Sequence, residues 1–301
     1  MKLGYLLGKP SGISIGACHF LVLRFDEKWG FNPDVGESLV MQNVGEVTHC
    51  LYGGRGWYTG LWRSPAGKVY ISDAAERIHF NPDPAPRAAP WRVDPLAGTL
   101  TGIWGLDDQF VLTWGLRRKT TVMYRYNGSK WSEIESPGEV VGVHGISPDL
   151  VMAVGTQGLI ARWDGKKWSR MVTPARGVLS AVHVASEDEM YAVGSKNGLY
   201  QGSVHGWAEV LEGPGPMFGI TKWKGEIWVG AAQNGLMKLA GNKLDVIKAN
   251  VKAEKLDARV DLLIGAPNMI VGTNDGARFI ATQTPTIAEM LANMKPAWVD
   301  G

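Results

Sequence analysis

The run VHGISPDLVMAVGTQGLIARWDGKKW, residues 143–168, contains short segments of β-forming residues separated by turn residues. Its Asp164-Gly165 pair tolerates the positive φ angles of a two-residue hairpin turn. Short β-branched and aromatic segments with such turns between them predict consecutive antiparallel strands. The run therefore predicts a small meander of strands rather than a helix.

The glycine that ends the segment VMAVG has counterparts along the chain. Similar β runs end at Gly115, Gly155, Gly194, Gly230 and Gly272, at intervals of 40, 39, 36 and 42 residues. A period near 40 residues with four short strands in each unit is typical of β-propeller blades. We therefore expect an all-β protein, a single β-propeller of four-stranded antiparallel sheets.

The number of blades follows from counting the repeats in both directions. Six blades are expected, and seven become possible if residues 22–50 form another. We expect residues 1–283 to form the propeller, with N-terminal strands completing the last blade so that no sheet edge stays open. In residues 284–301, helix-start signals and apolar residues on one helical face predict a short C-terminal helix packed on the propeller.

The motifs of residues 143–168 and GIWGLDDQFVLTWG, residues 102–115, resemble a bacterial β-propeller repeat. That family is grouped with Kelch-like and BNR-type propellers, and the likeness is clearest over residues 99–215. The resemblance implies the fold and little about activity, because propellers serve many unrelated functions. The sialidase Asp-box and the WD40 repeat signature are not met.

Composition limits the class of partner. The chain has 31 basic and 29 acidic residues, a net charge of +2, so we expect neither nucleic acid nor a membrane as partner. The N-terminal apolar run is too short for a signal peptide, which predicts a cytoplasmic protein. For Cys18 and Cys50 we expect two free thiols, with a disulfide between them as the alternative.

No motif in the sequence predicts catalysis. Nucleophile and phosphate-loop signatures are not found, so we expect a protein that is not an enzyme and uses no cofactor. Alignment of the innermost strands places one side chain of each blade at equivalent positions: Trp62, Trp104, His144, His183, Thr221 and Asp261. Packing between blades explains these residues best, and a metal or acid–base site at His144, His183 and Asp261 is the alternative.

Polar turns predict a face for a partner. The turns between second and third strands, together with the connections that lead into each blade, should share one face. The residues predicted there are Trp57, Tyr58, Arg117, Arg118, Lys119, Gln157, Arg176, Lys196, Asn197, Gln233 and Asn234. The turn at residues 117–119 is expected to be longer and more charged than its counterparts. A polar, partly basic rim with aromatic residues suits a protein interface.

The function predicted from these observations is binding of another protein through this face. A specific form of the hypothesis is an immunity-type protein that neutralises a secreted bacterial toxin by covering its active site. The alternative from another class is a carbohydrate-binding or glycan-active propeller, in which aromatic residues such as Trp57 and Tyr58 stack on sugar rings. A metal-dependent hydrolase that uses His144, His183 and Asp261 is a third hypothesis.

Overall fold

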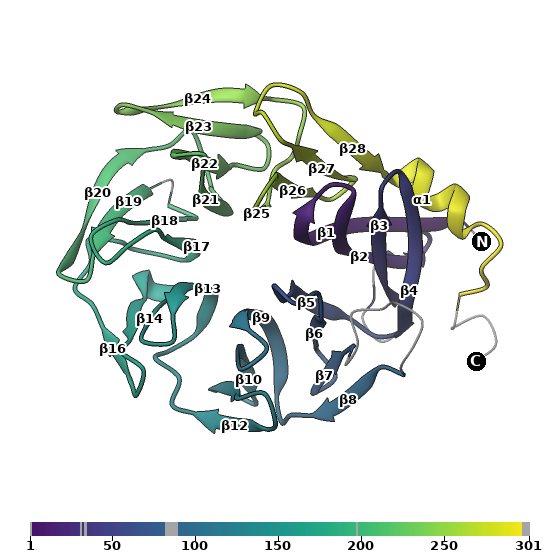
Figure 1. Ribbon diagram of the computed structural model, residues 1–301, viewed down its shortest axis with the longest axis horizontal. Helices are drawn as coiled ribbons and strands as arrows, with labels where there is room; N and C mark the ends of the chain where they lie inside the picture. The colour runs from purple at the N-terminus through teal and green to yellow at the C-terminus, as the bar shows by residue number, and fades with distance from the viewer. Residues whose placement is uncertain (1, 31, 33–34, 82–89, 197, 297–301) are drawn as a thin grey trace. The chain divides into compact units, whose positions relative to one another are not determined.

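The computed structural model describes residues 2–296 except 31, 33–34, 82–89 and 197. These residues form seven four-stranded antiparallel sheets, and within each sheet the strands are neighbours in chain order (Figure 1). The protein is an all-β propeller of seven blades with a short C-terminal helix. The predicted fold class is confirmed, and the blade number is the alternative, seven, rather than the preferred six.

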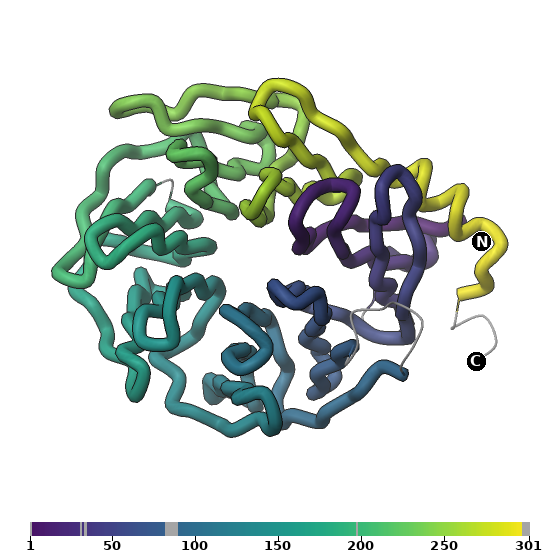
Figure 2. Tube along the Cα trace, viewed as in Figure 1, coloured from purple at the N-terminus to yellow at the C-terminus, as the bar shows by residue number. Residues whose placement is uncertain are grey.

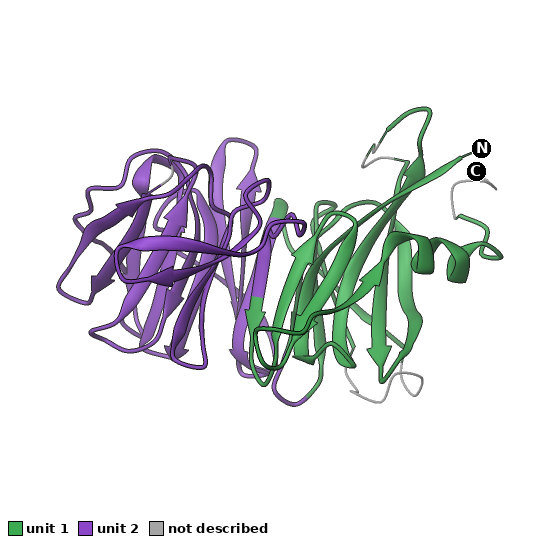
Figure 3. Cartoon of the chain, turned by 90° about the horizontal axis from the view of Figure 1, so that it is seen from above, with its two compact units in different colours: residues 1–63, 67–100, 257–301 green, residues 64–66, 101–256 purple. Residues whose placement is uncertain are grey.

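The chain divides into two compact units (Figure 3). Unit 1 comprises residues 1–63, 67–100 and 257–301, and unit 2 comprises residues 64–66 and 101–256. The first, second and seventh blades belong to unit 1. Their strands are β1 (Leu3–Ser14), β2 (Ala17–Asp26), β3 (Glu37–Val44), β4 (Val47–Arg55), β5 (Tyr58–Arg63), β6 (Val69–Asp73), β7 (Arg77–Phe80), β8 (Arg92–Pro95), β25 (Lys255–Ala258), β26 (Leu262–Ala266), β27 (Met269–Thr273) and β28 (Ile280–Gln283).

The third to sixth blades belong to unit 2. Their strands are β9 (Thr99–Asp107), β10 (Phe110–Arg117), β11 (Thr120–Tyr126), β12 (Trp131–Ile134), β13 (Val140–Ser147), β14 (Leu150–Gly155), β15 (Ile160–Trp163), β16 (Trp168–Arg170), β17 (Leu179–Val184), β18 (Met190–Gly194), β19 (Gly198–Ser203), β20 (Gly206–Glu212), β21 (Gly219–Trp223), β22 (Glu226–Gly230), β23 (Leu236–Ala240) and β24 (Lys243–Lys248). A 3-10 turn, η1 (Thr156–Gly158), joins β14 to β15.

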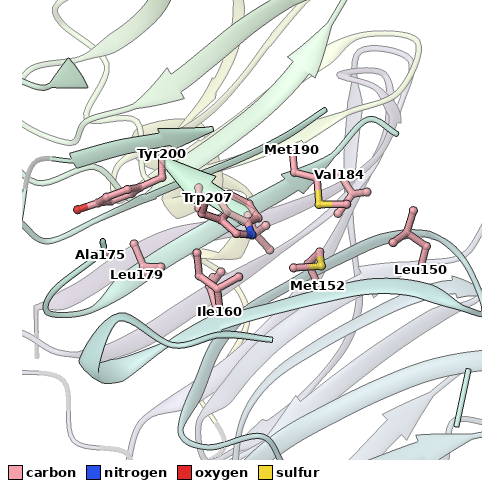
Figure 4. Close-up of a cluster of buried hydrophobic side chains, with 12 residues drawn as sticks. Leu150, Met152, Ile160, Ala175, Leu179, Val184, Met190, Tyr200 and Trp207 are labelled. Carbon is pink, nitrogen blue, oxygen red and sulfur yellow. The ribbon is translucent and has the colours of Figure 1, made fainter. Parts of the chain in front are cut away.

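The second strand of a blade is apolar on both faces because neighbouring blades cover both of its sides. All six residues of β14 are buried. Between the fourth and fifth blades, Met152 of β14 packs with Leu179 of β17 and Met190 of β18 (Figure 4). Strands buried on both faces have continuous apolar runs rather than alternation, which is why the sequence shows VMAVG and MYAVG.

The repeated glycine has a steric cause. A Cβ atom on Gly155 would lie 1.9 Å from the carbonyl oxygen of Glu139, and one on Gly194 would lie 2.1 Å from that of Val178. In both blades the connection into the first strand passes directly against the end of the second strand. Only glycine allows this approach of two backbones.

The prediction that N-terminal strands complete the last blade is wrong. Strands β1 to β4 form a complete first blade, and β25 to β28 form a complete seventh blade. The run LDARVDLLIG, residues 256–265, predicts one strand. It is instead divided between β25 and β26 at residues 259–261, where Asp261 donates its backbone N–H to the carbonyl of Ile13 at 3.0 Å. As a result Gly272 lies in the third strand of its blade, not the second.

The two ends of the chain lie side by side within unit 1 (Figure 2). Phe20 and Met41 of the first blade pack with Leu263 and Ile270 of the seventh, and helix α1 (Thr284–Leu291) adds Ile287 and Leu291 to the same cluster. The packed C-terminal helix is as predicted. The first and last blades are joined by side-chain packing and by backbone hydrogen bonds, such as the one from the N–H of Leu7 to the carbonyl of Pro267 at 2.8 Å, and not by a shared sheet.

Both cysteines are free thiols, as expected, and burial raises the pKa of the Cys18 thiol to about 12. Among the described residues, no helix is long and apolar enough to span a lipid bilayer.

Candidate functional site

One edge of unit 2 carries most of the residues predicted to bind a partner. We define the turn edge as the turns 118–119, 156–159, 195–196 and 231–235, together with the connections 135–139, 171–178, 213–218 and 249–254. Backbone hydrogen bonds join these segments. Thr156 donates to the carbonyl of Glu139 at 3.1 Å, and Gly158 of the fourth blade donates to the carbonyl of Gly177 at the start of the fifth. The polar side chains are therefore held on a fixed backbone.

The same pattern continues along the turn edge. Ser195 donates its N–H to the carbonyl of Val178 at 2.8 Å. Ala232 donates to the carbonyl of Ala253 at 2.8 Å, which ties the sixth blade to the connection that follows it. Few backbone degrees of freedom remain to be lost when such an edge is covered by a partner.

The turn at Arg117 differs from the expectation. Strands β10 and β11 extend through Arg117 and Thr120, so the turn itself is only Arg118–Lys119 and is not longer than its counterparts. Arg117 makes a two-pronged ion pair with Glu133 on β12, with both N–O distances 2.9 Å. This hydrogen bonding lowers the pKa of Glu133. Arg118 has a φ of 60° and is exposed, as is Lys119.

The other predicted residues of unit 2 also lie on the turn edge. Gln157, Arg176, Lys196 and Gln233 are exposed, and Asn234 is half-buried. Gln157 has a φ of 57°, within the left-handed region. Asn197 lies outside the described residues. No neighbouring acid of the described chain is recorded as an ion-pair partner of Arg118, Lys119, Arg176 or Lys196.

Trp57 and Tyr58 belong to unit 1, where Trp57 lies in the connection from β4 to β5 and Tyr58 is the first residue of β5. Trp57 is 42% exposed, whereas Tyr58 is 3% exposed, so the prediction that Tyr58 faces a partner is wrong. The alternation of β5 turns Tyr58 inward, where its ring stacks on Tyr52 with centroids 6.2 Å apart. Its backbone N–H donates to Ser38 Oγ at 2.9 Å, and burial raises the pKa of its hydroxyl.

The aligned histidines of unit 2 pack between blades. The rings of His144 on β13 and His183 on β17 are 4.5 Å apart, and Trp104 of β9 lies 6.0 Å from His144. His144 Nδ1 accepts the backbone N–H of Val184 at 3.1 Å, which joins the fourth blade to the fifth. Desolvation lowers the pKa of His183 to about 4, and that of His144 also lies well below its ordinary value.

These histidines form no recognisable metal centre. Thr221 Oγ1 lies 3.5 Å from His183 Nδ1. Asp261 is in the connection between β25 and β26 of unit 1, so its alignment with the innermost strands is wrong. Within the part of the chain that the structure describes, no three His, Cys, Asp or Glu side chains are grouped to hold a metal ion.

A polar network in unit 1 was not predicted. Asp73, fully buried at the end of β6, accepts hydrogen bonds from Arg77 Nη2 at 2.6 Å and from His79 Nε2 at 3.0 Å. The hydroxyl of Tyr52 lies 3.0 Å from the other ring nitrogen of His79, and Trp91 stacks on Tyr52 with centroids 4.4 Å apart. Despite desolvation, these hydrogen bonds lower the pKa of Asp73.

The sequence pattern that indicates this network is a single short run. In the run DAAERIHF, residues 73–80, Arg77 and His79 are two residues apart in one strand, so their side chains lie on the same face of it. A tight turn separates this strand from the carboxylate of Asp73. The network joins the first and second blades, with Asp73 and His79 buried and its other members half-buried, so it stabilises the packing of unit 1 rather than offering a reactive group.

Comparison with known proteins identifies the architecture. No family model matches the chain, and no curated protein matches it. The chain is similar to the WD40 β-propeller domain of Doa1, with a TM-score of 0.68 and 11% identity over 88% of this chain and 94% of that one. It is similar to YCF48 from Cyanidioschyzon merolae, with a TM-score of 0.63 and 11% identity over 90% and 95% of the two chains.

A structure of YCF48 bound to D1 peptide is also similar, with a TM-score of 0.63 and 12% identity over 88% of this chain and 92% of that one. At these identities the likeness shows the fold alone. The propeller implied by the bacterial repeat is thus confirmed as a fold, and no sequence family is shown.

Proposed function

We propose that the protein is a non-enzymatic propeller that binds another protein through the turn edge of unit 2. The observation that carries this proposal is the hydrogen-bonded row of turns and connections that presents exposed basic and amide side chains from successive blades. Arg118, Lys119 and Arg176 give the edge a positive character that complements an acidic protein surface. The peptide bound to the similar YCF48 propeller is consistent with this use of the fold.

A more specific form of the proposal is an immunity-type protein of the bacterial cytoplasm that neutralises a secreted toxin. The turn edge would cover the active site of the toxin sterically. A backbone already fixed by hydrogen bonds loses little entropy on binding, which favours the high affinity that such neutralisation requires.

The test uses two double variants with the same change of charge. Arg118→Glu with Lys119→Glu alters the turn edge, whereas Lys166→Glu with Lys167→Glu alters the hairpin turn at the other edge of the fourth blade. The side chains of Lys166 and Lys167 are exposed, and only their backbone N–H groups cap Asp164. We expect a protein from the native host to be retained by the wild type and the lysine control and lost from the turn-edge variant.

Equal retention by both double variants would place the interface elsewhere and contradict the proposal. For the toxin hypothesis, the gene immediately upstream should encode a toxin. Co-expression of the wild type should restore growth of cells producing that toxin, and the turn-edge variant should fail to do so.

Carbohydrate binding remains the second candidate function, because Trp57 presents an exposed indole in unit 1. Tyr58 cannot share in stacking on a sugar ring because it is buried. A glycan array probed with the wild type and with Trp57→Ala tests this alternative. Sugars that bind the wild type and do not bind Trp57→Ala would favour carbohydrate binding over protein binding.

A further inference from the structure

The segment that follows β28 crosses the seam between the first and seventh blades of unit 1. Residues 284–296, the closing strap, comprise helix α1 and the turn after it. The helix lies against β1 of the first blade and β28 of the seventh. Ile287 and Leu291, four residues apart on one face of the helix, are fully buried, whereas Thr286 and Glu289 are exposed. The helix is therefore held to the two blades by one narrow apolar face.

The two ends of the closing strap are bonded to different blades. At its start, Thr284 donates its backbone N–H and its hydroxyl to the carbonyl of Asn268, each at 3.0 Å, in the turn between β26 and β27 of the seventh blade. At its end, Arg24 donates from Nη1 to the carbonyl of Met294 at 3.0 Å and from Nη2 to that of Lys295 at 3.5 Å. Arg24 belongs to β2 of the first blade. The strap is thus fixed to the seventh blade at one end and to the first blade at the other.

No sheet holds the seam beneath the strap. In the part of the chain that the structure describes, no strand of the first blade pairs with a strand of the seventh. The described residues make two backbone-to-backbone hydrogen bonds across the seam, from Leu7 to Pro267 at 2.8 Å and from Asp261 to Ile13 at 3.0 Å. The seam consequently depends on side-chain packing, and the strap supplies part of that packing through its two buried side chains.

The contacts of the closing strap are lost together or not at all. A helix of eight residues is too short to be stable in water by itself, so α1 persists only while Ile287 and Leu291 are docked. Arg24 also donates from Nε to Glu37 at 2.8 Å, and both residues lie in the first blade. Because this ion pair does not involve the strap, release of the strap leaves no buried charge without its countercharge. Bound and released are therefore two distinct states.

We propose that the closing strap is a releasable closure of unit 1. While bound, it holds the first blade against the seventh, and its release lets the two blades separate at the seam as a local opening, without unfolding either blade. Each blade is a complete four-stranded sheet, so the separation breaks no strand pairing. This closure is independent of the proposed turn-edge interface in unit 2.

Amide hydrogen exchange of the full chain, followed residue by residue by NMR under native conditions, tests the proposal. The reporters are the N–H groups of Leu7 and Asp261, which cross the seam, and the reference is that of Ile71, fully buried in β6 of the second blade. In the wild type we expect opening at the two reporters to be at least about tenfold more frequent than at the reference, because the seam opens locally. Equal protection at all three positions would mean that the seam opens only in global unfolding, and would overturn the proposal.

A variant of the strap and a matched control sharpen the test. Leu291→Ala weakens the docking of the helix and should raise the exchange rates of Leu7 and Asp261 by about tenfold or more, with the rate of Ile71 unchanged. Glu289→Ala alters an exposed position of the same helix and should leave all three rates unchanged. The proposal fails if Leu291→Ala accelerates the reference as much as the reporters, or leaves the reporters unchanged. The wild-type comparison keeps the test decisive should Leu291→Ala not fold.

Discussion

The two compact units are built from the same four-stranded blade but bury different chemistry. In unit 1 the described structure buries Arg24, Glu37, Asp73 and Asp261, whereas the buried polar side chains of unit 2 are those of Ser64, Thr113 and Thr221. Unit 2 also holds the regular repeats with their glycine-ended strands. Blades that keep the repeat are therefore held by apolar packing and backbone turns, and blades that have lost it add buried charges and their hydrogen bonds to an apolar core.

The largest effect on the free energy of unfolding is expected at the buried ion pair of unit 1. Arg24 is fully buried, donates to Glu37 from Nε at 2.8 Å, and donates from Nη1 to the carbonyl of Met294 at 3.0 Å after helix α1. Glu37→Gln leaves a buried guanidinium without its countercharge, so the free energy of unfolding should fall by about 3–5 kcal/mol. Denaturant unfolding measures this loss.

The matched control is the exposed ion pair of the same blade. Lys2 and Glu27 lie 2.7 Å apart, with side chains 83% and 40% exposed. Glu27→Gln should therefore change stability by less than about 1 kcal/mol. Equal losses in the two variants would mean that buried charge does not hold unit 1 together.

The apolar counterpart in unit 2 is Met152, at the centre of β14 and fully buried. Met152→Ala leaves a cavity between the fourth and fifth blades and should lower the free energy of unfolding by about 3 kcal/mol. The loss should be the same at low and high salt, because no charge is involved. Val172, which is 92% exposed, is the control: Val172→Ala should have little effect. A loss at Met152 that changes with salt would contradict the contrast between the units.

The same contrast explains how much of the fold could be predicted. The blades of unit 2 follow from the sequence because Gly155 and Gly194 are required by a close backbone approach, which leaves a visible period. The first blade lacks that glycine, and its charged pair Arg24–Glu37 has no periodic signature. The sequence therefore predicts that strands of this blade complete the last one, and it favours six blades over seven.

The candidate site shows a similar division. The turns of unit 2 could be placed on one edge because strand order fixes where each hairpin turn lies. The burial of Tyr58 could not be predicted from the sequence, because it depends on contacts with the rings of Tyr52 and His79, which lie in two other strands.

An intermediate effect on stability is expected from the two packed histidines of unit 2, His144 and His183. The pKa of His183 is lowered to about 4 from an ordinary 6.5, mainly by desolvation. The unfolded chain therefore binds the proton first, and stability is fully present above pH 6.5 and falls as the pH drops toward 4. His183→Gln should remove part of this slope of unfolding free energy against pH. An unchanged slope would assign the acid sensitivity to other groups, such as His144 and the still more deeply buried His19.

The smallest effect is expected at the turn edge itself. Gln157 is exposed and has φ 57° and ψ 32°, a left-handed conformation that costs a side chain energy and glycine none. Gln157→Gly should therefore raise the free energy of unfolding by about 0.5–1 kcal/mol. This is the gain from relieved strain minus the cost of the greater conformational freedom of glycine in the unfolded chain. Gln233 is exposed on the same edge without a positive φ, so Gln233→Gly should give no gain. Thermal unfolding compares the stabilities of the two variants.

Because unit 1 has its own left-handed turn residue, Glu76 with φ 63°, Glu76→Gly extends the comparison to that unit. Similar gains at positions 157 and 76 would show that the turns obey the same backbone rule in both units, and that the units differ only in what they bury.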